Sequence, residues 1–93
     1  MTAAPERYTG EVTTGPGGAM TDEVGVITGD LTLTTSTRPD GQADLRIQYT
    51  GADEWYTLTG SPTPIPPDTG LQDLHARALE AVRHGGQATT LRK

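Results

Sequence analysis

The chain has 93 residues, a formal net charge of −5 and no cysteine. A chain this short predicts a single small domain, and the absence of cysteine excludes disulfide bonds, thiol catalysis and a Cys-based zinc site. Leu, Ile and Val account for only 15 residues and Phe for none, so we expect a small core and modest stability.

Targeting signals are the next feature that the sequence can exclude. It contains no run of about 18 apolar residues, so we expect no membrane span. The first residues, MTAAPER, lack the basic segment and the following apolar segment of a signal peptide. We therefore expect a cytoplasmic protein with no membrane partner.

Three segments alternate apolar and polar side chains with a period of two residues, namely 7–14, 26–35 and 44–50. Within 26–35, Ile27, Leu31 and Leu33 share one face, whereas Thr32 and Thr34 share the other. Such alternation is typical of antiparallel strands with one face in the core and one face in water.

Two hairpin loops connect these segments to one another and to a fourth strand. Residues 39–41 (PDG) predict a three-residue loop that places Leu33 opposite Ile47 and Leu31 opposite Tyr49. This register brings apolar side chains together on the face that should be buried. The second loop, around 51–53, leads into a strand whose expected register puts Tyr56 in the core, opposite Ile47. In the same register, Leu58 faces Leu45, and the polar face receives Trp55, Thr57 and Thr59.

After a proline-rich connector at 61–68, the period changes to that of an amphipathic helix. Apolar and core-facing residues recur at helical spacing: Leu71, Leu74, His75, Ala78, Leu79 and Val82. Thr69 and Gln72 have the spacing of a capping box, and Gly85 supplies the stop signal.

Together these elements predict one α+β domain over 1–93, a four-stranded antiparallel β-meander with one C-terminal amphipathic helix packed on one face. Residues 1–6 and 87–93 are expected to be flexible, unless 87–93 adds a short fifth strand. Residues 15–18 (GPGG) are expected to form a mobile connector. They do not fit a phosphate loop, because no Gly-Lys-Ser/Thr follows them and no helix begins there.

Few residues could carry catalysis. His75 is expected to border the core, and His84 is expected to cap carbonyl groups at the end of the helix. Ser61 does not lie in a Gly-x-Ser-x-Gly turn, and Asp73 is only two residues from His75, whereas helical neighbours are three or four residues apart. The sequence therefore predicts no enzyme, no cofactor and no metal site.

Trp55 is the most informative single residue. Strand parity places it on the face opposite the helix, near Arg46 and Gln48, with Thr57 beside it. A Trp among polar residues is a natural anchor for a protein partner. Alternatively, Trp55 covers the end of the hairpin or is turned inward by a bulge, because a slip of one residue inverts the face. The candidate partner-binding residues are therefore Trp55, Arg46, Gln48 and Thr57.

These observations favour a small non-enzymatic protein–protein interaction module, regulatory or inhibitory, that binds through the sheet face opposite the helix. The alternative is a nucleic-acid-associated regulator, either monomeric or dimeric. It would use Arg46 and Trp55 with the basic residues Arg83, Arg92 and Lys93. The negative net charge argues against nucleic acid. A third alternative is an enzyme that uses His75 or His84. A homodimer would add buried area to the small core.

Overall fold

The computed structural model describes residues 6–85, which form seven strands and one helix. The strands are β1 (Arg7–Thr13), β2 (Ala19–Thr21), β3 (Gly25–Ile27), β4 (Asp30–Thr37), β5 (Gln42–Tyr49), β6 (Tyr56–Thr57) and β7 (Thr63–Pro64). The helix, α1, spans Gly70–His84. The predicted α+β class is confirmed. The predictions for 1–5 and 87–93, including the fifth strand, lie outside the described residues.

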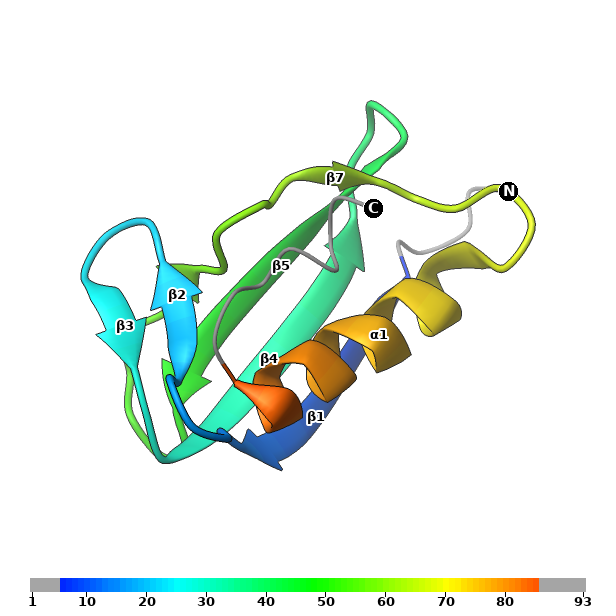
Figure 1. Ribbon diagram of the computed structural model, residues 1–93. Coiled ribbons are helices and arrows are strands. Elements are labelled where there is room, and N and C mark those ends of the chain that lie inside the picture. Colours follow the sequence, from blue (N-terminus) through cyan, green and yellow to red (C-terminus); the bar gives the residue numbers. More distant parts are fainter. Residues whose placement is uncertain (1–5, 86–93) are drawn as a thin grey trace.

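The main sheet is antiparallel, with strand order β1-β4-β5-β6, and β7 pairs with the other end of β5. These strands follow one another in the order that the predicted meander requires. Figure 1 shows α1 lying across one face of this sheet, over β1 and β4. The hairpin formed by β2 and β3 stands at one end of the sheet (Figure 1).

The β4–β5 hairpin has the register predicted from its loop. Leu33 pairs with Ile47, and Leu31 pairs with Tyr49. Gly41 has the expected left-handed conformation, with φ of 87°. Tyr49 departs from the prediction, because its side chain is 42% exposed rather than buried. It is the last residue of β5, whereas α1 packs over β1 and β4.

The edge of β5 is completed by two short strands. Ile47 pairs with Tyr56 as predicted, and the N–H of Leu58 donates to the carbonyl of Leu45. Between β6 and β7, the Ser61 hydroxyl accepts a hydrogen bond of 2.9 Å from the N–H of Leu45. The segment 61–68, predicted to be a connector, thus also contributes β7 and supplies an acceptor to β5.

The strand predicted over 26–35 is instead two strands, because β3 ends at Ile27 and β4 begins at Asp30. Gly29, with φ of 108°, lies between them, and its N–H donates to the Thr14 hydroxyl. Ile27 therefore belongs to the β2–β3 hairpin, where it pairs with Ala19. Both side chains still reach the core, which explains why the alternation seemed to continue through the break.

The core lies between the main sheet, α1 and the β2–β3 hairpin. Its buried side chains are Val12, Ala19, Ile27, Leu31, Leu33, Ala43, Leu45, Ile47, Leu58, Leu71, Leu74, Ala78 and Val82. Removal of this apolar surface from water is the main stabilising force of the fold.

Residues 15–18 form a packed junction rather than the mobile connector that we predicted. The N–H of Gly15 donates to the carbonyl of Val82 at 3.2 Å. A methyl group on Gly15 would collide with the backbone carbonyls of Arg83 and His84. The connector therefore lies directly against the end of α1, at a distance that only glycine permits.

The two ends of α1 differ from each other. At the N-terminus, the Thr69 hydroxyl forms no cap hydrogen bond and donates to Asp73 at 3.2 Å, so the predicted capping box with Gln72 is wrong. At the C-terminus, Gly85 is left-handed, with φ of 83°, and its N–H donates to the Ala81 carbonyl as a stop signal should. No helix in the described part of the chain is long and apolar enough to cross a membrane.

Candidate functional site

The outer face of the main sheet is the face opposite α1. Strand alternation and register assign to it Arg7, Thr9, Glu11, Thr13, Asp30, Thr32, Thr34, Ser36, Asp44, Arg46, Gln48, Trp55 and Thr57. Most of these side chains are exposed or half-buried. α1 and the hairpin residues Ala19 and Ile27 pack on the other side, so the described elements leave this face open to a partner.

A groove of about 380 Å³ crosses the outer face from β1 to the segment before β6. It is lined by Arg7, Thr34, Ser36, Asp44, Arg46 and Trp55. The register explains this grouping, because Arg7, Ser36 and Asp44 lie in one row across the strands. Trp55 is 37% exposed, so its indole lines the groove without being buried. Of the two interpretations of Trp55, the structure therefore supports the outward one.

The charges of the groove are only partly neutralised. Asp44 accepts a hydrogen bond of 3.1 Å from Arg38, which also contacts Asp40. The N–H of Gln42 and the guanidinium of Arg38 hold the pKa of Asp40 below its usual value. In contrast, Arg7 and Arg46 form no ion pair or side-chain hydrogen bond with the described residues.

Two of the four predicted partner-binding residues are already engaged within the chain. The amide of Gln48 donates to the carbonyl of Ala52 at 2.8 Å. Thr57 donates through both its N–H and its hydroxyl to the carboxylate of Glu23, at 2.7 Å each. These bonds, with a smaller contribution from Arg46, lower the pKa of Glu23. The structure thus brings Arg46 and Trp55 together in the groove but does not bring Gln48 and Thr57 into it.

The sequence prediction missed four groove residues, which lie on β1, β4 and β5. Arg7, Thr34, Ser36 and Asp44 belong to the polar face by parity, but parity alone does not say which rows align. The missing signal is the pairing of β1 with β4, in which Arg7 faces Ser36. The segment between β1 and β4 contains the β2–β3 hairpin, which the sequence pattern did not predict. The length of that segment therefore does not indicate how β1 and β4 pair.

The residues considered for catalysis are held apart by structural contacts. His75 is only 8% exposed, and a hydrogen bond of 2.8 Å joins its Nδ1 to the Thr35 hydroxyl. Its ring stacks on Tyr8 at a centroid distance of 5.7 Å. Burial lowers the pKa of His75, because it disfavours the charged imidazolium. Ser61 accepts the N–H of Leu45 instead of approaching His75.

His84 does not cap the helix carbonyls as predicted, but lies on the helix surface with its Nε2 3.1 Å from the Glu80 carboxylate. No group of three or more His, Asp or Glu side chains among residues 6–85 could hold a metal ion. A second hollow, of about 600 Å³, lies at the other end of the sheet between Glu11, Asp30, Thr50 and Arg83. Arg83, the basic residue that lines this hollow, is paired with Glu80 at 2.8 Å. Among the described residues, the hollow therefore offers no unpaired positive charge.

No protein-family model, no curated protein and no solved structure matches this chain.

Proposed function

We propose that the protein is a non-enzymatic interaction module that binds a protein partner through the outer face, and so regulates or inhibits that partner. The observation that carries this proposal is the half-exposed indole of Trp55 in the same groove as the guanidinium of Arg46, which has no ion pair with any residue of 6–85. Trp and Arg are the residue types most enriched among those that dominate binding energy.

The chemistry of the groove indicates what the partner presents to it. An apolar or aromatic side chain would stack on Trp55, and a carboxylate would neutralise Arg46. Guanidinium groups bind carboxylates through two parallel hydrogen bonds, which adds orientation to affinity. The partner segment is therefore expected to carry an acidic residue close to an apolar one.

The first test is a capture experiment from the lysate of the source organism, at low and high salt. The baits are the wild-type chain, Trp55→Ala and Tyr49→Ala, each shown to be folded by circular dichroism. Tyr49 is a matched control because it is an exposed aromatic residue that belongs to the other face of the sheet. A protein retained by wild type and Tyr49→Ala at both salts, and lost with Trp55→Ala, is the expected result.

The captured partner is then titrated against the purified chains by calorimetry. Trp55→Ala should weaken binding by at least about thirtyfold, the effect of removing a dominant contact residue. Equal affinity for wild type and Trp55→Ala would refute the proposed site. Capture of nucleic acid at low salt alone would favour the alternative regulator, whose affinity must fall steeply with salt.

A further inference from the structure

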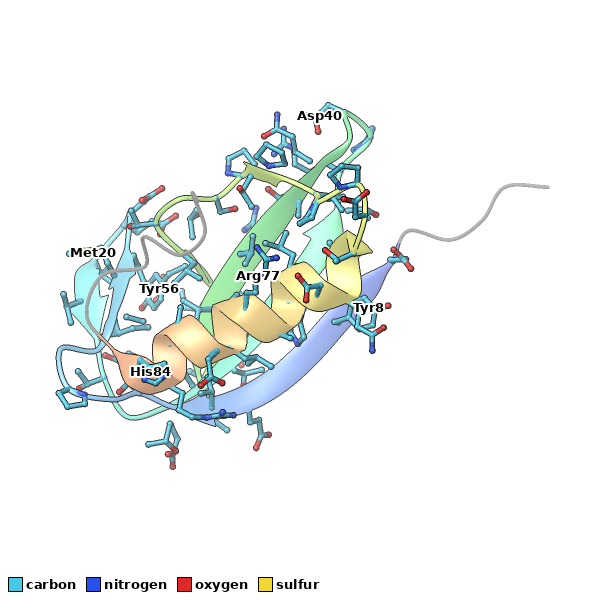
Figure 2. All side chains as sticks on the ribbon, turned by 45° about the vertical axis from the view of Figure 1, so that its right-hand side comes forward. Tyr8, Met20, Asp40, Tyr56, Arg77 and His84 are labelled. Atoms are coloured by element: carbon cyan, nitrogen blue, oxygen red, sulfur yellow. The ribbon has the colours of Figure 1, made fainter. Side chains whose placement is uncertain are left out.

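Among residues 6–85, the main sheet ends in a long edge strand, β1, that pairs on one side only. β1 runs without a bulge from Arg7 to Thr13, and every residue is in register with β4. Figure 2 shows β1 along one margin of the molecule, with the labelled Tyr8 near its start. Natural edge strands are usually blocked by proline, lysine, a bulge or a short length. β1 has no proline, lysine or bulge, and its two charged side chains, Arg7 and Glu11, are of opposite sign.

The hydrogen-bond pattern identifies the groups that are free. The N–H of Thr14 donates to Gly29, and the carbonyl of Glu6 accepts from Thr37, so the even-numbered residues bond to β4. Since backbone groups alternate in direction along an antiparallel strand, Arg7, Thr9, Glu11 and Thr13 point theirs away from the sheet. These N–H and C=O groups have no partner strand among residues 6–85.

We propose that the protein forms a symmetric homodimer in which β1 pairs antiparallel with β1 of a second copy, with Thr9 opposite Thr9. In this register, Arg7 of each copy faces Glu11 of the other. Two ion pairs and about six backbone hydrogen bonds then form across the edge. Shifting the strands by two residues in one direction places Glu11 next to Thr9, without an ion pair. A shift of two more residues places Glu11 against Glu11, which is repulsive.

The elements above the strand also fit a second copy. α1 lies over β1 and β4, and a two-fold axis at the edge of β1 is perpendicular to the sheet. The two helices then lie on the same face, antiparallel and about 10 Å apart, which is the usual packing distance. Tyr8 and Leu79, which are only partly buried at this edge, would be covered by the partner. The exposed Ala76 lies on the same flank of α1 and permits close approach of the helices.

The dimer would join two outer faces into one continuous surface. Arg7, at the β1 end of the groove, would pair with Glu11 of the second copy, whereas Trp55 and Arg46 lie farther from the β1 edge and would stay open in each copy. The dimer would therefore present two equivalent binding surfaces to a partner. The proposal of a dimer does not depend on the proposed function.

The test combines oligomeric state with a charge swap. Wild type should sediment as a dimer at micromolar concentration, and either Arg7→Glu or Glu11→Arg should weaken dimerisation at least about tenfold. An equimolar mixture of the two variants should recover the dimer, because every facing pair is then of opposite charge. Arg46→Glu is the matched control on an interior strand and should stay dimeric. The proposal would be overturned if wild type stayed monomeric at a concentration about 100-fold above the micromolar range. It would also be overturned if the mixture of the two variants did not form the dimer.

The register is tested by disulfide cross-linking, which is clean because the chain has no native cysteine. Thr9→Cys places the two thiols at facing positions, about 5.5 Å apart between Cα atoms, within the range that a disulfide spans. Thr13→Cys is the control on the same strand and face, because its two copies would be about 26 Å apart. Rapid cross-linking of Thr9→Cys alone is expected. Equal cross-linking of both variants, or cross-linking of Thr13→Cys alone, would contradict the register.

Discussion

On the inner face of the main sheet, Leu33, Leu45 and Ile47 have no exposed surface, whereas their neighbours on the outer face, Thr34 and Arg46, remain half-buried or exposed. Both faces are built from alternate residues of the same strands. The inner face is covered by α1 and the hairpin, and the described elements leave the outer face open. Under the proposed function, stability depends on the inner face and partner binding on the outer face, so substitutions should separate these two properties.

The largest expected effect is on the inner face. Leu33→Ala should lower the free energy of unfolding by about 2–5 kcal/mol, because it leaves a cavity in a fully buried site. Thr34→Ala, one residue away on the outer face, should change it by less than about 1 kcal/mol. Urea denaturation of the two variants measures both values. Similar losses would show that the outer face is buried too.

A smaller effect is expected at the junction between the connector and α1. Gly15→Ala should cost about 1–3 kcal/mol, since its new methyl group meets rigid backbone carbonyls. Gly10→Ala should cost less than Gly15→Ala, because its methyl group meets side chains rather than backbone, namely the flexible end of Leu79 at 3.1 Å and the His75 ring at 3.3 Å. Thermal unfolding compares the two glycines. A fully stable Gly15→Ala would mean that the connector is loose, as its sequence suggests.

The buried His75 should make stability depend on pH near neutrality. Its pKa lies below the ordinary 6.5 in the folded chain, so the unfolded chain binds the proton more readily. Stability should therefore fall as the pH drops from 7 to 5, by at most about 1.4 kcal/mol per pH unit. The lowered pKa values of Glu23 and Asp40 act only below about pH 5. Denaturation at several pH values should show a weaker dependence in His75→Gln than in wild type. A wild-type curve that is flat over this range would contradict the burial of a neutral ring.

The smallest expected effect distinguishes residues within the outer face. Gln48→Ala should weaken partner binding less than about threefold, because its amide is already bonded to Ala52. A loss as large as that of Trp55→Ala, measured by the same calorimetry, would place Gln48 in the interface and extend the site beyond the groove.

The sequence pattern predicted most of the main sheet because three long segments alternate and one loop has a well-defined turn. It did not reveal the β2–β3 hairpin, since strands of three residues are too short to show a period. Gly29 breaks the chain within what looked like one strand. The exposure of Tyr49 also could not be predicted, because it depends on where α1 crosses the sheet.

The candidate site was predictable only in part. Parity assigned Trp55 and Arg46 to one face, and both side chains line the same groove. Parity does not reveal internal partners, however, and so it could not exclude Gln48 and Thr57, which bond to Ala52 and Glu23. Nor could it place Arg7 in the groove without the register of β1.

The most direct test of the outer face as a binding surface uses the fluorescence of Trp55, the only tryptophan of the chain. Acrylamide quenching is measured in the free protein and after saturation with the captured partner. The structure predicts ready quenching in the free protein and strong protection in the complex. Equal quenching in both states would show that the partner binds elsewhere, and weak quenching in the free protein would contradict the open face itself.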